Sequence, residues 1–147
     1  MSLRDYQQAA VDSTLNWLRY KGTPAIVVIP TGGGKSWCIK ALLERFQDEG
    51  KRALLLAHRK ELLTQTGNLL ACPFGYYSAQ LGEKATGHLI TLGGIQSATR
   101  ADLPPLDYIL VDECHRLPNN REGQYWSLIA KHPTTLAAGC FAIRLQY

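Results

Sequence analysis

The 147-residue sequence predicts an α/β fold, a mainly parallel β-sheet with helices on both faces. Two observations predict it. Apolar segments of strand length alternate along the chain with amphipathic segments of helix length, as expected for right-handed crossovers between parallel strands. The first apolar segment, AIVVI at 25–29, has no polar residue to turn toward water, which is typical of a strand buried on both faces. The length suits one domain.

Each element follows from its own pattern. Residues 5–20 are predicted as a helix because their apolar side chains recur at helical spacing, and KGTP at 21–24 ends it. A second helix is expected at 35–50, where Gly50 can cap the end. Further strands are expected at 52–58, around Tyr76 and Tyr77, and at 88–93, 107–113 and 134–143, with helices at 60–70, 94–100 and 123–132.

The composition argues against a membrane protein. No run of eighteen apolar residues occurs, whereas a membrane-spanning helix needs about 20, and the N-terminus lacks the layout of a signal peptide. We therefore expect a cytoplasmic protein with no membrane partner. The four cysteines form no C-x-x-C pair, so we expect reduced thiols that bind no metal. The net charge of +4 permits a polyanionic partner without requiring one.

The glycine-rich segment IPTGGGKS at 29–36 predicts a phosphate-binding loop. Glycines let backbone N–H groups converge where side chains would clash, and the start of the following helix adds its positive dipole end. Lys35 can reach the β- and γ-phosphates of a nucleotide, and the Ser36 hydroxyl suits Mg²⁺. The alternative, a flexible turn beside a solvated lysine, fits the strand–loop–helix context poorly. Ile29 stands where the strict pattern has glycine. The expected cofactor-binding residues of the loop are Thr31, Gly32, Gly33, Gly34, Lys35 and Ser36.

The segment DECH at 112–115 supplies the groups that a phosphate cradle lacks. It follows the apolar run YILV, so its acids fall at the carboxyl end of a strand, where ligands of open α/β sheets bind. Asp112 fits the role of holding Mg²⁺, and Glu113 fits that of a general base acting on water. A surface acid pair is the alternative for an isolated DE. We expect the two motifs to lie on adjacent strand ends.

PTGGGKS followed by DECH resembles the superfamily 2 helicases and translocases of the DEAD/DEAH-box kind. LRDYQQAAV resembles their adenine-reading segment, and LLLAHRKELLTQ and TLGGIQSATR resemble two nucleic-acid-contacting segments. The match runs from Leu3 to about Leu136. The segments AHRKEL, QS and DECH most resemble those of bacterial RadD-type repair helicases. The resemblance implies that residues 1–147 form a RecA-like P-loop NTPase domain, the first of two such domains.

The resemblance also implies roles for individual residues. ATP would bind with Mg²⁺, Arg4 and Gln7 would read adenine, and His115 would relay between the ATP site and later segments, joining Lys35, Asp112 and Glu113 as catalytic residues. A nucleic-acid strand, DNA rather than RNA, would contact His58, Arg59, Gln65, Gln96, Ser97 and Arg100. Solvated surface charge is an equally good interpretation of Arg59 and Arg100, and an ordinary strand-end histidine a better one of His58 taken alone.

Two departures from the family pattern bear on activity. Gly139 to Ala142 stand where the family has Ser/Thr-Ala-Thr, and a second RecA-like domain with arginine fingers is not among the 147 residues. We therefore expect this chain to bind nucleotide but to hydrolyse it slowly unless a second domain acts in the same chain or in another. The alternative is a nucleic-acid or partner-binding module without catalytic activity. A small P-loop kinase fits poorly, because DECH has no part in such an enzyme.

Overall fold

The structure is a computed structural model that describes residues 3–20, 25–30, 34–57, 59–112 and 140–146. The β-strands in these ranges form one sheet in the order β1-β7-β6-β2-β5-β3-β4. All neighbouring strands are parallel except β3 and β4, which pair antiparallel. The predicted parallel sheet is thus confirmed, with one antiparallel edge strand added.

The elements agree closely with the sequence pattern. The helices are α1 (Asp5–Tyr20), α2 (Lys35–Asp48), α3 (Lys60–Leu69) and α4 (Ile95–Arg100). The strands are β1 (Ala25–Pro30), β2 (Ala53–Ala57), β3 (Gly75–Ser78), β4 (Glu83–Lys84), β5 (Ile90–Gly94), β6 (Tyr108–Asp112) and β7 (Cys140–Gln146). In these parts of the chain no helix is long and apolar enough to cross a membrane.

Two differences from the sequence prediction are visible, and one expected helix is not tested. The two-residue strand β4 was not expected, because it is too short to show a period. The last strand, expected at 134–143, continues to Gln146 in its described part. The helix expected at 123–132 lies outside the described residues.

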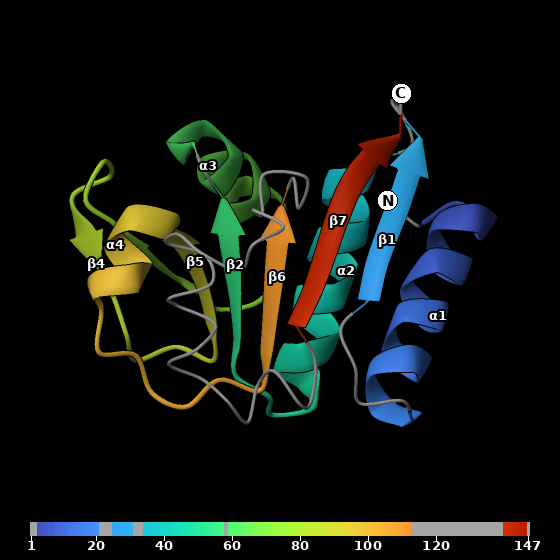
Figure 1. The fold of residues 1–147 in the computed structure, drawn as a ribbon, viewed down its shortest axis with the longest axis horizontal. Coiled ribbons are helices and arrows are strands. Elements are labelled where there is room, and N and C mark those ends of the chain that lie inside the picture. The colour runs from blue at the N-terminus through green and yellow to red at the C-terminus, as the bar shows by residue number, and fades with distance from the viewer. Residues whose placement is uncertain (1–2, 21–24, 31–33, 58, 113–139, 147) are drawn as a thin grey trace, which may run out of the picture.

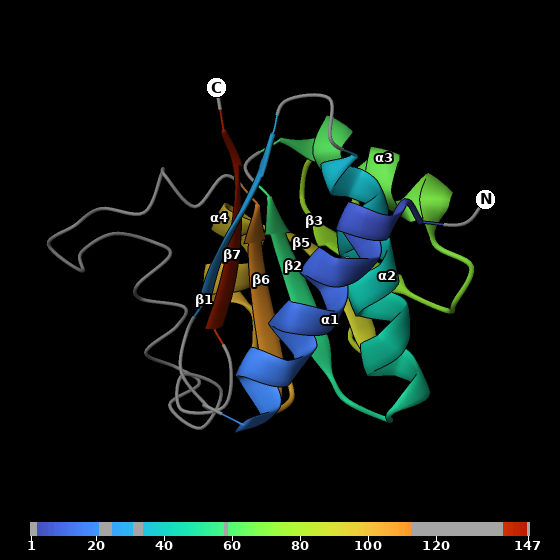
Figure 2. The same ribbon diagram turned by 90° about the vertical axis from the view of Figure 1, so that its right-hand side faces the viewer.

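Helices cover both faces of the sheet, as expected (Figure 1). Figure 2 shows α1, α2 and α3 on one face and α4 on the other. This arrangement explains why every residue of β2 and β6 is buried. With no strand face left for water, an apolar strand such as ALLLA at 53–57 is stable only in this position.

The main core lies between the sheet and α2. Four apolar side chains of α2, spaced at three and four residues, are almost completely buried there: Ile39, Leu42, Leu43 and Phe46. The ring of Phe46 stacks on Tyr108 at the start of β6, with the ring centroids 4.2 Å apart and the planes 11° from parallel. This contact fixes the C-terminal half of α2 against the sheet, and so helps to position the N-terminal end of the helix, where the glycine-rich loop ends.

The C-terminus of α2 is closed by the glycine that the sequence predicts. Gly50 has φ of 69°, and its N–H donates to the carbonyl of Gln47 at 3.0 Å. The next N–H, that of Lys51, donates to the carbonyl of Phe46 at 2.9 Å. These two bonds form a Schellman motif, which satisfies carbonyl groups that the helix leaves unpaired.

Replacing Gly50 with alanine should lower the free energy of unfolding by about 1–2 kcal/mol, because an L side chain is strained in the left-handed region. No atom lies within 4 Å of a β carbon built at Gly50, so backbone strain is the only cost. Gly87→Ala is the matched control, since Gly87 has equally open surroundings and no positive φ. Urea unfolding of the two variants measures the difference. Equal stability of both would contradict the assignment of the helix end.

Candidate functional site

The glycine-rich loop and the acidic motif meet at the carboxyl edge of the sheet. Lys35 is the first residue of α2, and Asp112 is the last residue of β6. The Nζ atom of Lys35 lies 2.7 Å from Oδ1 of Asp112, and the two side chains are only 11% and 7% exposed. The structure therefore brings together the two residues on which the predicted site depends.

The expectation that the two motifs lie on adjacent strands is wrong. β7 lies between β1 and β6, so that Val27, Ile143 and Asp112 are aligned in register across three strands. The order of parallel strands is set by how the crossovers pack, which local sequence patterns do not encode. The long side chain of Lys35 still reaches Asp112 from the start of α2.

The members of the Lys35–Asp112 pair satisfy each other electrostatically. Oδ1 of Asp112 is buried, and the Lys35 ammonium group lies beside it within hydrogen-bonding distance. Each group therefore neutralises the charge of the other. Removing either charge would leave the other buried and unpaired, which would lower the free energy of unfolding. The pair is therefore expected to persist until other charged groups replace its members.

Gly34, the last residue of the glycine-rich loop, has a backbone conformation that favours glycine and lies close to Gln7. Its φ is 79°, in the left-handed region, and a β carbon there would overlap the side-chain nitrogen of Gln7. Its carbonyl accepts the N–H groups of Trp37 and Cys38 at 3.1 and 3.3 Å, which begins the hydrogen-bond pattern of α2. The backbone therefore approaches α1 closely where α2 begins.

Gln7 is positioned by the start of α1. It is buried, and its Oε1 accepts the backbone N–H of Arg4 at 2.9 Å. A side chain at the third helical position that bonds back to the N-cap is one half of a capping box. The structure thus places Gln7 against Gly34, while the Arg4 side chain is exposed.

A pocket of about 590 Å³ opens beside the ion pair. This volume lies within the range of about 300–1,000 Å³ typical of small-molecule sites. Its described lining comprises Gly34 before α2, Lys35, Ser36, Trp37 and Ile39 from α2, Leu62, Gln65, Thr66 and Leu69 from α3, and Asp112. Charged and hydroxyl groups occur together with an apolar wall, as a ligand with a polar tail and an apolar body requires.

Two features of this pocket differ from or add to the sequence analysis. Gln65, expected to contact nucleic acid, lines the pocket together with Lys35. Trp37 and the α3 leucines were not singled out. The position of Trp37 directly after Ser36 was the available signal, because the first turn of this helix lines the pocket.

The described cysteines are poor candidates for reactive groups. Burial raises the pKa of the Cys38 thiol, which lies on the face of α2 that packs into the core. Burial, and then the charge of Glu44, raises the pKa of Cys72. Both thiols are therefore protonated at neutral pH, as expected of small hydrophobic side chains.

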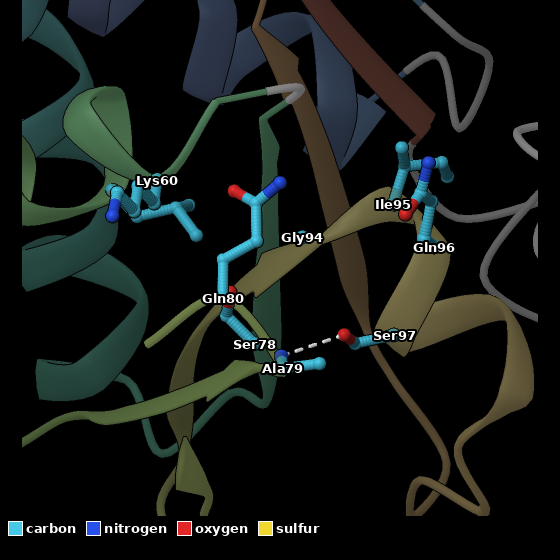
Figure 3. A pocket seen from close by; sticks show the side chains of 9 residues that line it. Lys60, Ser78, Ala79, Gln80, Gly94, Ile95, Gln96 and Ser97 are labelled. Carbon is cyan, nitrogen blue, oxygen red and sulfur yellow. Dashed lines mark hydrogen bonds between the residues drawn. The ribbon is translucent and has the colours of Figure 1, made fainter. Parts of the chain in front are cut away.

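A second group of predicted residues gathers at the carboxyl ends of β3 and β5. Gln96 and Ser97, on α4, line a small pocket with Lys60 and Ser78 (Figure 3). Arg100, also on α4, and Arg59, before α3, are exposed. The remaining predicted residues lie outside the described part of the chain: Thr31, Gly32, Gly33, His58, Glu113 and His115.

Comparison with known proteins agrees with this arrangement. Residues 1–138 match the family described as "Type III restriction enzyme, res subunit" (ResIII). The curated protein "Putative ATP-dependent helicase IRC3" from Saccharomyces cerevisiae is 29% identical over 134 residues, which covers 77% of this chain and 19% of the yeast protein.

Solved structures share the fold at low sequence identity. The SWI2/SNF2 ATPase core of Sulfolobus solfataricus in complex with dsDNA has a TM-score of 0.72 at 13% identity and covers 98% of this chain and 32% of its own. The UvsW helicase from bacteriophage T4 has a TM-score of 0.71 at 17% identity, covering 98% of this chain and 52% of its own. The Hef helicase domain of Pyrococcus furiosus has a TM-score of 0.68 at 22% identity, covering 97% and 32%.

The chain spans about a fifth of the length of its curated relative. Within that span, the family match covers nearly the whole sequence and the structural matches share its RecA-like architecture. The chain therefore belongs to the ResIII family, and it shares the RecA-like fold of helicase and ATPase cores.

Proposed function

We propose that this chain binds Mg-ATP in the Lys35–Asp112 pocket and is the nucleotide-binding half of a helicase or translocase. The observation that carries the proposal is the buried ion pair at the N-terminus of α2, beside a pocket of nucleotide size. A lysine and an aspartate held together at the carboxyl edge of a parallel sheet are suited to exchange partners for phosphate and metal.

The residues present fit a nucleotide with its metal. The Asp112 carboxylate is an oxygen ligand of the type that Mg²⁺ prefers, and Ser36 lines the same pocket. Bound Mg²⁺ would neutralise phosphate charge and polarise the phosphoryl oxygens. Lys35 would leave Asp112 and donate to the β- and γ-phosphates. Gly34 would let backbone N–H groups approach the same phosphates, where a β carbon is already excluded.

The remaining roles in hydrolysis are also proposed. Glu113 would accept a proton from the attacking water, and His115 would couple the site to the nucleic-acid path. Thr31, Gly32 and Gly33 would complete the phosphate loop, and Arg4 and Gln7 would read adenine. The contact of Gln7 with Gly34 supports this last assignment, because it joins the start of α1 to the loop.

We further propose nucleic acid, DNA rather than RNA, as the partner. Two similar structures, the SWI2/SNF2 core and the LlaGI restriction-modification enzyme, are described in complex with dsDNA and with a DNA substrate mimic. Gln96, Ser97 and Arg100 gather on α4 beside Lys60, a surface that suits a phosphate backbone. His58 and Arg59 would extend the same path, whereas Gln65 belongs to the nucleotide pocket.

A second RecA-like domain, in the same chain or in another, would supply the arginine that hydrolysis requires. The alternative function is a non-catalytic binding module. One observation favours it: Gly139 to Ala142 lack the hydroxyl groups that the family uses to couple hydrolysis to movement. Nucleotide binding is common to both a full enzyme and an inactive relic, so turnover is what separates them.

Lys35→Ala should weaken binding of a fluorescent ADP or ATP analogue with Mg²⁺ by about 10- to 100-fold, because charge-assisted hydrogen bonds to phosphate are lost. Lys40→Ala is the matched control. Lys40 lies on the same helix but pairs with Glu44 at 2.6 Å, away from the pocket. A titration in which Lys35→Ala and Lys40→Ala bind alike would remove the proposed site.

The 147-residue chain alone should hydrolyse ATP about 10³- to 10⁵-fold more slowly than a nucleotide hydrolase whose arginine finger is in place. Steady-state phosphate release, with Lys35→Ala as the background, measures this rate. Rapid turnover by the isolated chain would show that a catalytic arginine is already present in it, and would contradict the need for a second domain.

A further inference from the structure

The hairpin formed by β3 and β4 stands beside α4 and forms one wall of a shallow surface groove. Two adjoining hollows, of about 90 and 190 Å³, make up this groove. Both are lined by Ala79, Gln96 and Ser97. Lys60 and Gln80 lie at the first hollow, as Figure 3 shows, and Tyr77, Lys84 and Arg100 line the second.

The two tyrosines of β3 face opposite sides of the sheet. Tyr76 packs toward α3, where its hydroxyl occupies the space that a β carbon on Gly67 would need, and its ring meets Phe74 edge to face at 5.2 Å. Because side chains alternate along a strand, Tyr77 points the other way, into the groove beside α4. Tyr77 is only partly buried, so one of its surfaces remains available to a ligand.

The register of the hairpin places a cation next to Tyr77. Lys84 lies directly opposite Tyr77 in the antiparallel pair, so the two side chains share a face. Glu83 is opposite Ser78 and therefore faces away from this pair. Arg100, from the last turn of α4, lines the same hollow. No acidic residue occurs among the described residues that line either hollow.

A hydrogen bond between the hairpin and α4 places a hydroxyl group in the groove. The backbone N–H of Ala79 donates to Oγ of Ser97 at 2.8 Å, the dashed line in Figure 3. The Ser97 oxygen is thereby used as an acceptor, and a hydroxyl that accepts one bond can still donate its own proton. A phosphate or sugar oxygen is an acceptor of the required kind.

Aromatic, cationic and hydroxyl groups in one groove fit a single-stranded nucleic acid better than other polyanions. Bases of an unpaired strand can stack on an aromatic ring while cations follow the backbone. A duplex offers no free base face, and the acidic side chains of a peptide do not stack on an aromatic ring. We propose that the β3–β4 hairpin binds a single nucleic-acid strand, with one base stacked on Tyr77 and the flanking phosphates on Lys84 and Arg100.

This inference rests on the proposed nucleic-acid function and adds a base contact to a path otherwise made of backbone contacts. Neither Tyr77 nor Lys84 belongs to the motifs that predicted that path. The base contact would give the bound strand a fixed register on this domain, since stacking holds one nucleotide at one place.

Fluorescence anisotropy with a labelled oligothymidylate tests the base contact on the 147-residue chain. Tyr77→Ala should weaken binding by about 5- to 150-fold, the range for loss of one base–aromatic stack, and Tyr77→Phe should bind like the parent. On an abasic strand of equal length, parent and Tyr77→Ala should bind equally. Circular dichroism checks that Tyr77→Ala is folded, and the abasic strand separates lost stacking from general damage.

The phosphate contact is tested by salt. Lys84→Gln should reduce the slope of log affinity against log salt by about 0.7, the value for one phosphate contact to a single strand. Lys51→Gln removes the same charge from the exposed turn before β2. Lys51 lies at the amino-terminal end of this strand, whereas the groove lies at the carboxyl ends of β3 and β5, so the slope should be unchanged.

The outcomes separate the two levels of the proposal. Normal binding by Tyr77→Ala and an unchanged slope for Lys84→Gln, with Arg100→Gln weakened, would overturn the hairpin contact and leave the α4 path intact. No binding by the parent chain at low salt would overturn the nucleic-acid function itself. Equal displacement of the oligothymidylate by polyglutamate would show that the groove takes acidic polypeptide instead.

Discussion

The pairing of Lys35 with Asp112 is the constraint from which the site derives its geometry. Each charge is largely removed from water, and each is tolerated there because the other is present. The pair can form only if α2 begins, and β6 ends, at the same edge of the sheet. An arrangement that kept Lys35 and Asp112 buried but apart would leave two buried charges without partners.

The surrounding structure holds both ends of that pair in place. β6 is buried along its whole length, so Asp112 is attached to a fully packed strand. α2 is held at its C-terminal half by the Phe46–Tyr108 stack and closed at its C-terminus by Gly50. An ion pair between Arg19 and Glu49 joins the ends of α1 and α2. The functional groups thus stand on packed elements, which favours a preformed site.

Local patterns in the sequence predicted most elements, because burial of one face of an element makes apolar residues recur at a regular spacing along the chain. The helix at 5–20 and the glycine that ends α2 are examples, and both are confirmed. The position of β7 between β1 and β6 could not be predicted, since strand order depends on packing between distant segments. The same limit applies to Gln65, whose place in the pocket depends on how α3 packs beside α2. The opposite facing of Tyr76 and Tyr77 follows from alternation, but which of them faces α4 required the structure.

A double-mutant cycle on stability tests the central pair most directly, without nucleotide. Lys35→Met and Asp112→Asn should each lower the free energy of unfolding by about 3 kcal/mol, because each leaves one buried charge unpaired. The double variant should lose less than the sum, giving a coupling energy of about 1–3 kcal/mol. Single effects that add to within about 0.5 kcal/mol would show that the two side chains do not interact, and would contradict the account of the site.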